Sequence, residues 1–437
     1  MKKMKRILAL TMALVMVMAL AACGGKDEPA PDTTTPDEPT ETTQEITLWT
    51  YPIGNWGKED VVNELMAQFE ADTGIKVKVE YLAYADGDDK VNSAISANGA
   101  PDLIMEGPER LVANWGAKGY MVDLADLLDD TDKTEINAAA LTACTTADGK
   151  VYEYPVVMTA HCMAINKNAF EEAGALQYVD LENHTWTTDN FVKAVEALYA
   201  HYGQTVGAVF CAGQGGDQGT RALITNLNGG TYANAEHTEY TYASQENAEA
   251  LARLYAQDGI TFDTAIQATE EIQNFVNGTF QMAFCWNISQ EVNNADVLGF
   301  DVLPMAFPSD TTPSLQGGIW GFGIFNNGDD ARIEAAKTFI KFMTEDDAQY
   351  TKAVEATSFA PVRDVEGVYA TNELFPEYSL LSPMMGDYYQ ITKGWTPART
   401  EWWNMLQRVS ASDGSVDSIL AEMQTAQDAA NAAAAAE

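Results

Sequence analysis

Hydrophobic residues along the chain recur at two spacings, the alternation typical of a strand and the three-to-four-residue period typical of a helix. The run "ITLWTY" predicts a strand, and "KEDVVNELMAQFEADT" places apolar residues at helical spacing until Gly74 ends the helix. "IKVKVEYL" alternates as a half-buried strand does. The next segments, "KVNSAISANG", "PDLIME" and "RLVANWGAKG", predict helix, buried strand and helix in turn.

Later segments continue this order. "DGKVYEYPVVMTAHCMAINKNAFEEAG" predicts two strands and a short helix, whereas "TDNFVKAVEALYAHYG" and "SQENAEALARLYAQDG" predict amphipathic helices. Three more strands are expected in "GTFQMAFCW", "GFDVLPMAF" and "GIWGFGIF", followed by a long helix or helix pair in "ARIEAAKTFIKFMTEDDAQYTKAVEA" and an alanine-rich helical end that frays. The alternation predicts an α/β fold with a parallel or mixed sheet flanked by helices, in which ligands bind at the carboxyl ends of strands.

The start of the chain does not follow this pattern. Residues 1–22 join a basic start to an apolar run that is too short for a good membrane-spanning helix, which indicates a secretory signal peptide. The run ends in "LAAC", which resembles the lipobox of bacterial lipoproteins. We therefore expect Cys23 to carry acyl chains such as palmitate; a plain leader beside a chance cysteine is the alternative. Residues 23–44 predict a disordered acidic Pro/Thr linker that tethers the body to the outer face of the bacterial cell membrane.

Composition limits what the remaining chain can be. About 390 residues are more than one core accommodates, so two lobes are expected. A formal charge of -39 repels phosphate backbones and argues against nucleic acid as a partner. Acidic pairs such as Asp88-Asp89 are expected on solvated faces. The four cysteines of the body could pair in three ways, and buried free thiols are the preferred interpretation of Cys144, Cys162, Cys211 and Cys285.

Signatures of catalysis and of bound cofactors are missing from the sequence. The histidines and cysteines do not show the spacing of a zinc site, and the glycine-rich "AGQGGDQGT" lacks the lysine of a phosphate-binding loop. Neither a GxSxG elbow nor a dinucleotide-binding GxGxxG segment is present. We therefore expect no catalytic residues, no metal and no cofactor.

Aromatic residues in loops point to a ligand class. Trp56 in "PIGNWG" and Trp395 in "TKGWTP" stand in turn-rich segments, which seldom bury an indole without a partner. An aromatic ring face stacks well on the C–H surface of a sugar. The sequence therefore favours carbohydrate.

Several segments in a shared order resemble a known family. "FEADTGIKVKVEYL", "PDLIMEGPERLVANWGAKGYMVDL" and "YEYPVVMTAHCMAINKNAFEEAG" are followed by "FVNGTFQMAFCW", "LQGGIWGFGI", "AAKTFIKFMT" and "SFAPVR". Over residues 46–363 the chain resembles the family 1 extracellular solute-binding proteins of ABC importers, the group that includes maltose-binding protein. The resemblance implies a monomeric, non-enzymatic protein that captures a carbohydrate, expected to be an oligosaccharide, and passes it to the transmembrane subunits of an ABC permease.

The resemblance also implies a two-lobed, class II periplasmic-binding-protein-like fold that closes on its ligand. The chain is expected to cross between lobes near residues 155–158, 304–314 and 357–362. The first lobe would then comprise residues 45–156 plus 315–357, and the second residues 157–314 plus 358–437.

Ligand-binding residues are implied unevenly by the family's motifs. The acid-arginine pair that holds sugar hydroxyls aligns with Glu109 and Arg110, whereas Glu106 replaces an aromatic residue and so argues against maltose itself. Thr159 stands where the family has a ligand glutamate, and His161 follows on the same side of a strand. The other expected ligand-binding residues are Tyr51, Asn55, Trp56, Trp286, Trp320, Arg363 and Trp395.

Two other functions stay open at this stage. A binding protein for a non-sugar solute, such as a polyamine or glycerol phosphate, would share the fold; Glu106 and Glu109 would suit a cation. A secreted carbohydrate-active enzyme would need a pair of carboxylates in its cleft.

Overall fold

The computed structural model describes residues 44–84, 86–213 and 217–436. The expected leader, Cys23 and nearly all of the tether therefore lie outside the described residues. Within those ranges, no helix combines the length and the apolar character needed to cross a membrane.

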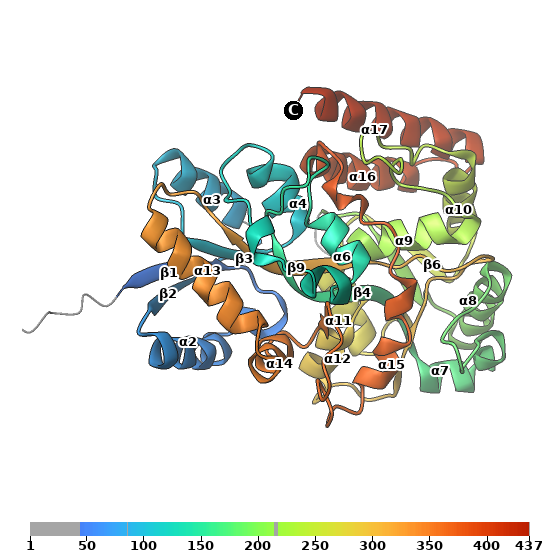
Figure 1. Ribbon diagram of the computed structural model, residues 1–437. Coiled ribbons are helices and arrows are strands. Elements are labelled where there is room, and N and C mark those ends of the chain that lie inside the picture. The colour runs from blue at the N-terminus through green and yellow to red at the C-terminus, as the bar shows by residue number, and fades with distance from the viewer. Residues whose placement is uncertain (1–43, 85, 214–216, 437) are drawn as a thin grey trace, which may run out of the picture. The chain divides into compact units, whose positions relative to one another are not determined.

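One eight-stranded sheet organises the fold (Figure 1). Its strands follow the order β10, β4, β9, β3, β1, β2, and β7 and β8 also pair with β4. β1 is parallel to β2 and β3, whereas β9 is antiparallel to β3 and β4, so the sheet is mixed. The strands are β1 (Glu45–Thr50), β2 (Lys76–Tyr81), β3 (Leu103–Glu106), β4 (Tyr154–Asn166), β7 (Met282–Trp286), β8 (Val302–Met305), β9 (Gln316–Ile324) and β10 (Ala360–Pro361). A separate parallel pair is formed by β5 (Gly207–Phe210) and β6 (Ile260–Asp263).

Most of the expected helices are present. The helices around the first strands are α2 (Glu59–Thr73), α3 (Gly87–Ser96), α4 (Pro108–Arg110), a π-helical turn at Leu111–Gly116, α5 (Asp132–Glu135) and α6 (Ala138–Ala143). Further along are α7 (Lys167–Glu172), α8 (Thr188–Tyr202), α9 (Asp217–Asn228), α10 (Gln245–Tyr255), α11 (Ala268–Val276), α12 (Ile288–Asn294), α13 (Asp330–Thr344), α14 (Asp347–Glu355), α15 (Phe375–Ser379), α16 (Trp395–Ser410) and α17 (Val416–Ala436). α2 ends as predicted, because Gly74 takes a left-handed φ of 73° that favours glycine.

Buried apolar residues form two clusters. The first core is built by β1, β3, α2, α13, α14 and the first half of β4, and contains Leu48, Ile104, Phe69, Phe339, Val354 and Val157. The second core is built by the second half of β4 with β7, α8, α9, α10, α16 and α17, and contains Ile165, Phe284, Leu198, Leu223, Leu251, Trp402 and Met423. All four described cysteines are buried free thiols, as preferred from the sequence.

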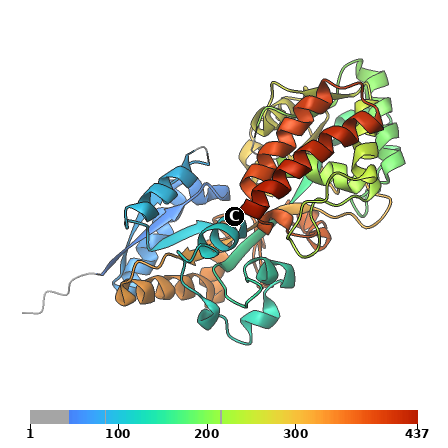
Figure 2. The same ribbon diagram turned by 90° about the horizontal axis from the view of Figure 1, so that it is seen from above.

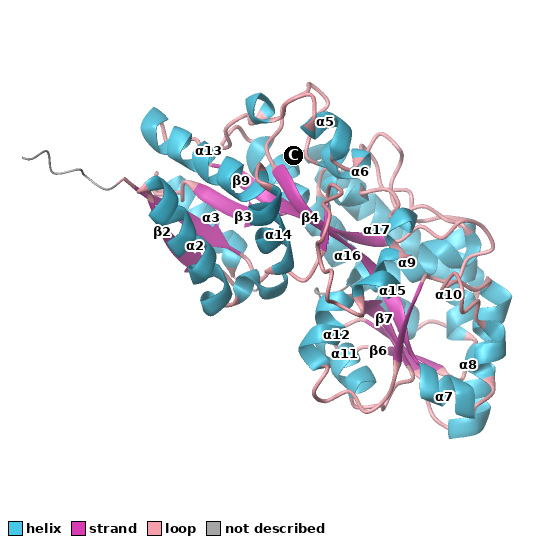
Figure 3. Cartoon of the chain, turned by 60° about the horizontal axis from the view of Figure 1, so that its bottom comes forward, coloured by secondary structure: helices cyan, strands magenta, loops and turns pink. Residues whose placement is uncertain are grey.

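β4 belongs to both cores. Its first half pairs with β9 and β10, and its second half pairs with β7 and β8 (Figure 3). Met158 accordingly packs in the first core and Cys162 in the second. The prediction of an additional strand just before β4 is wrong, because Val151 makes only an isolated bridge to Thr145 across a tight turn.

The alanine-rich C-terminal segment does not fray. Ala426, Ala430 and Ala434 are buried on one face of α17, which lies beside α16 (Figure 2). Small side chains allow close packing here: a Cβ atom added to Gly394 would lie 2.8 Å from the Ala434 nitrogen. The prediction of a fraying end was therefore wrong, because the small side chains of the segment pack against the neighbouring helix.

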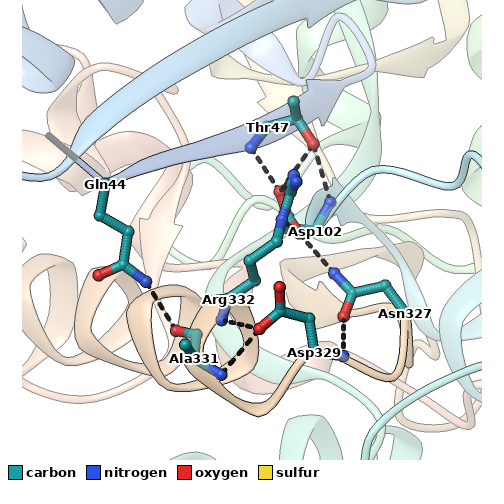
Figure 4. Close-up of polar contacts among 7 residues, drawn as sticks. All are labelled: Gln44, Thr47, Asp102, Asn327, Asp329, Ala331 and Arg332. Carbon is teal, nitrogen blue, oxygen red and sulfur yellow. Dashed lines mark hydrogen bonds and ion pairs between the residues drawn. The ribbon is translucent and has the colours of Figure 1, made fainter. Parts of the chain in front are cut away.

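A buried carboxylate links β1, β3 and α13 (Figure 4). Asp102 accepts hydrogen bonds from the Thr47 backbone nitrogen at 2.7 Å and from Asn327 Nδ2 at 2.6 Å. The Arg332 guanidinium donates to both Asp102 oxygens, with Nε 2.7 Å from Oδ1. Because Asp102 precedes β3 directly, these bonds hold the amino end of that strand and leave its carboxyl end for other contacts.

Candidate ligand-binding site

Polar and aromatic side chains gather at the carboxyl ends of β1 and β3. Tyr51 follows β1, Glu106 ends β3, and the short helix α4 begins with Pro108 and carries Glu109 and Arg110. Proline suits the first turn of a helix because no partner is needed there for a backbone N–H. The parallel pairing of the two strands brings these residues to one edge of the sheet.

Arg110 is surrounded by three carboxylates. Its Nε atom lies 2.7 Å from Asp88 Oδ1, and its NH1 atom lies 2.6 Å from Glu106 Oε1 and 3.3 Å from Glu109 Oε1. The Tyr51 hydroxyl also donates to Asp88 Oδ1, at 2.5 Å. We call Asp88, Glu106, Glu109 and Arg110 the acid-arginine cluster. The expectation of a solvated face is confirmed for Asp89, which is exposed, and in part for Asp88, whose side chain is 40% exposed. The sequence did not predict that the Asp88 carboxylate, at the start of α3, would also contact the Arg110 guanidinium.

A tyrosine ring is exposed beside this cluster. Tyr84 is 44% exposed and stacks on buried Tyr51, with ring centroids 5.1 Å apart and planes 26° apart. The Arg110 guanidinium lies over both rings, at 5.1 Å from the Tyr51 centroid and 5.6 Å from that of Tyr84. This packing supports the exposed ring against the body of the protein and gives it a fixed orientation.

Two consecutive tyrosines connect the cluster to the second core. The Tyr388 hydroxyl donates to Glu109 Oε2 at 2.8 Å and the ring packs in the first core, whereas Tyr389 packs in the second. Tyr389 accepts a hydrogen bond from Arg221 Nε at 2.9 Å. Arg221 in turn lies 4.8 Å from the centroid of Trp395, so this predicted aromatic residue reaches the same region.

Negative charge exceeds positive charge within the cluster. Burial raises the pKa of Glu106 above its usual range, while Arg110 opposes the rise. Burial would lower the pKa of Arg110, but Glu106, Glu109 and Asp88 raise it well above its usual value. Glu153 is fully buried nearby, and its pKa is raised by burial and by the charges of Glu109 and Glu106. The cluster therefore offers carboxylate acceptors and a permanently charged donor.

Thr159 and His161 lie on β4, where the strand passes from the first core to the second. They pair with Gly318 and Gln316 of β9, and both side chains are nearly buried. His161 Nδ1 lies 3.2 Å from Cys285 Sγ. Burial, with the nearby charge of Arg221, lowers the pKa of His161 to about 4, so the imidazole is neutral at pH 7.

The other predicted site residues do not join this group. Trp56 and Trp286 are fully buried, and their indole nitrogens donate to the Ala353 carbonyl at 3.2 Å and to the Tyr378 hydroxyl at 2.7 Å. Trp320 stacks on Phe359 at 4.8 Å, Asn55 donates to Ser358 Oγ, and Arg363 contacts Asp347 and lies over the Tyr350 ring. The structure thus brings together Tyr51, Glu106, Glu109, Arg110 and, through Tyr388 and Tyr389, Trp395.

Sequence reasoning missed three residues of the region, namely Tyr84, Asp88 and Tyr388. One signal was available for Tyr84, because it follows β2 and the carboxyl ends of parallel strands meet at one edge. The contact between Tyr388 and Glu109 joins positions 279 residues apart and has no local signal.

Comparison with known proteins places the chain in a family. Residues 64–375 match the model of the family described as bacterial extracellular solute-binding protein. The chain belongs to this family. It is therefore a solute-binding protein, which confirms the family predicted from the sequence.

Relatives of this solute-binding protein are distant. A maltooligosaccharide ABC transporter solute-binding lipoprotein of Streptococcus pneumoniae is 26% identical over 279 residues, which span 60% of this chain and 62% of that relative. A cyclic α-maltosyl-1,6-maltose binding protein from Arthrobacter globiformis superposes with a TM-score of 0.71 at 22% identity, over 90% of this chain and 99% of the other. An ABC substrate-binding protein of Listeria monocytogenes in complex with cycloalternan gives 0.70 at 19% identity, over 89% and 98%. These structures confirm the periplasmic-binding-protein fold.

Proposed function

We propose that this protein captures an oligosaccharide at the acid-arginine cluster and delivers it to the permease subunits of an ABC transporter. The observation that carries the proposal is the exposed ring of Tyr84 held next to Glu109 and Arg110. Sugar hydroxyls pair with carboxylate and guanidinium groups, and the C–H face of a sugar stacks on an aromatic ring. The names of the relatives, which refer to maltooligosaccharides and cyclic glucosides, support a saccharide ligand.

In this proposal the two cores belong to two lobes that close on the ligand. The proposed boundaries start from the expectation of residues 45–156 plus 315–357 in one lobe and 157–314 plus 358–437 in the other. Val157, Met158, Phe359 and Val362 move to the first lobe, because they pack in the first core. Support comes from β4, whose residues are divided between the cores. The chain also passes from one core to the other at the start of β9, because Leu315 just before the strand packs in the second core and Ile319 packs in the first. Bound sugar would contact both lobes and shift the population toward the closed form.

The proposal also includes a location. Cys23 would carry the lipid anchor, and the linker up to residue 44 would hold a monomeric binding protein near the permease on the outer face of the membrane. The lipoprotein named among the relatives supports this arrangement.

A cationic solute is the second candidate. Three carboxylates face one arginine in the cluster, and this excess of negative charge favours a polyamine over glycerol phosphate. A ligand with several ammonium groups would bind more weakly as salt is added, whereas binding of a neutral sugar would not change in this way.

The test is a ligand panel measured by tryptophan fluorescence and thermal shift, with oligosaccharides in one arm and polyamines in the other. A cognate saccharide should raise the melting temperature by mass action. Tyr84→Ala should weaken its binding about 10-fold or more, because burying a ring face stabilises by on the order of 1.5–3 kcal/mol.

Tyr120→Ala is the matched control for that variant. Tyr120 is 43% exposed, similar to Tyr84. It lies near the amino end of β3 rather than the carboxyl end, and its carbonyl accepts a hydrogen bond from the Asn326 backbone nitrogen, just after β9. If Tyr84→Ala binds the saccharide with unchanged affinity, the Tyr84 ring does not contact the ligand. If polyamines raise the melting temperature and no oligosaccharide of a broad panel does so, the ligand is a cation and the sugar proposal fails.

A further inference from the structure

The start of α16 carries two side chains into the region of the acid-arginine cluster. Trp395 is the first residue of the helix, and its buried indole nitrogen has no hydrogen-bond partner within the described residues. The Arg399 guanidinium, one turn further, lies 5.7 Å from the centroid of the Trp395 ring. Burial and the charge of Arg110 lower the pKa of Arg399, and the charge of Glu109 opposes this change, so Arg399 lies within electrostatic range of the cluster.

The turn that leads into α16 is held by a residue from a distant part of the chain. Gly394 precedes the helix with a left-handed φ of 68°, and glycine has no side chain that could cap the helix. The Tyr240 hydroxyl lies 2.8 Å from the Lys393 carbonyl oxygen and 3.2 Å from that of Thr392, and donates to this pair. Because Tyr240 is only 1% exposed, water does not compete for the bond.

The second half of α17 holds Tyr240 in turn. Asn431 Oδ1 accepts from the Tyr240 backbone nitrogen at 2.8 Å, and Asn431 Nδ2 donates to the Tyr240 carbonyl at 3.1 Å. Ala434, one turn further along α17, packs directly against Gly394. Tyr240 lies between α9 and α10, so three parts of the chain that are distant in sequence or separated by a turn meet at the start of α16 (Figure 2).

We propose that Tyr240 and Asn431 are positioning residues, which hold the start of α16 where its indole ring and its guanidinium face the acid-arginine cluster. The inference rests on the proposed function, because it concerns the wall of the same site that the second core supplies. Neither residue is expected to contact the ligand. Because binding groups that are misplaced by about 1 Å lose much of their contribution, a buried hydroxyl outside the site can set the affinity.

The first test removes the hydroxyl that holds the turn. Tyr240→Phe keeps the ring and should weaken oligosaccharide binding by about 3- to 10-fold, because the start of α16 loses its attachment. Asn431→Ala should have a similar effect. The double variant should bind no more weakly than the weaker single variant, since both changes act through the same bond. Isothermal titration calorimetry of the full chain measures the affinities, with maltotriose and then the panel saccharide that gives the largest thermal shift as probes.

Tyr255→Phe is the matched control. The Tyr255 hydroxyl donates to the Ser412 carbonyl at 2.9 Å, just beyond the other end of α16. The control therefore removes the same kind of bond next to the same helix, and it should lower the melting temperature about as much as Tyr240→Phe while leaving the affinity unchanged. If Tyr255→Phe weakens binding as much as Tyr240→Phe does, any loss of stability near α16 weakens binding and the inference fails.

A measurement without ligand separates this inference from the proposed function. Amide hydrogen exchange over residues 392–399 should be faster in Tyr240→Phe and Asn431→Ala than in the wild type and in Tyr255→Phe. If the wild type binds no oligosaccharide but exchange responds in this way, the proposed function fails and Tyr240 still positions the start of α16. If exchange over these residues does not change, or if Tyr240→Phe binds the saccharide as tightly as the wild type, the inference fails.

Discussion

Glu271 on α11 shows how much one buried carboxyl group can influence stability. The residue is fully buried, its Oε1 atom accepts from the Phe284 nitrogen at 2.6 Å, and its Oε2 atom has no hydrogen-bond partner within the described residues. Burial raises the pKa of Glu271 to about 8. Between the pKa of the unfolded chain and this value the folded protein binds the extra proton, so the free energy of unfolding falls as the pH rises.

Glu271→Gln should therefore reduce this pH dependence. The amide oxygen can still accept from Phe284, but the variant avoids a charge whose burial costs on the order of 3–5 kcal/mol at pH 8. Urea unfolding at pH 5 and pH 8 should show a smaller loss of stability between the two values in the variant than in the wild type. Exposed Glu64, changed to Gln, is the control. Equal losses in Glu271→Gln and wild type would show that Glu271 ionises in the folded protein at its ordinary pKa.

At the same scale, the residues of the site were only partly predictable from sequence. Glu109 and Arg110 were predicted because the acid-arginine pair of the family that the chain resembles aligns with them. Trp56 and Trp286 looked like ligand rings, but a turn-rich loop and a strand end also place indoles inside cores, where each finds a hydrogen-bond acceptor. Exposure of a side chain depends on what packs over it, and the sequence near that residue does not contain this information.

Among the structural elements, β1, β3 and α13 depend on Asp102, which is 1% exposed. Asp102→Ala removes acceptors for Thr47, Asn327 and Arg332 together. Water can solvate Arg332, whose side chain is 41% exposed, but the groups that donate to the buried Asp102 carboxylate lose their acceptor, so we expect the free energy of unfolding to fall by about 1–3 kcal/mol. Chemical denaturation followed by circular dichroism measures the change.

Asp126→Ala is the comparison for that prediction. Asp126 contacts Lys337 at 2.6 Å, but its side chain is 60% exposed, so solvent screens the pair and its loss should cost about 0–1 kcal/mol. Similar losses in the two variants would mean that the Asp102 bonds contribute no more than a surface pair.

The elements themselves were largely readable from the hydrophobic pattern. α2 and β2 appear where their periods place them, because each turns one face toward the first core. β3 appears where its continuous apolar run places it, because all four of its residues are buried. The pattern was less informative where packing between distant segments decides the outcome. The second half of α17 is alanine-rich, and its burial depends on packing against α16 and α10, which are distant from it in sequence or separated from it by a turn.

For the whole molecule, the feature that sequence could not supply is how closely β9 approaches β4 between the cores. A Cβ atom added to Gly317 would lie 1.9 Å from the Thr159 carbonyl oxygen, so any side chain there must push the strands apart. β4 carries residues of both cores, and Leu315 just before β9 packs in the second core, so a shift at this point changes how the cores are joined. Gly317→Ala should therefore lower the melting temperature, at a cost of about 1–3 kcal/mol or more, and also weaken ligand binding.

Gly299→Ala distinguishes this effect from a general cost of replacing glycine. Nothing lies within 4 Å of a Cβ atom added at Gly299, so its variant should match the wild type in both measurements. Thermal unfolding reports the strain between β4 and β9, and titration with the cognate ligand reports whether that strain reaches the site. A Gly317→Ala variant that is destabilised yet binds normally would mean that the strand crossing holds the fold together without setting the geometry of the ligand site. A variant indistinguishable from Gly299→Ala in both would mean that β9 can move away from β4 freely, and the close approach of the strands would then have no mechanical role.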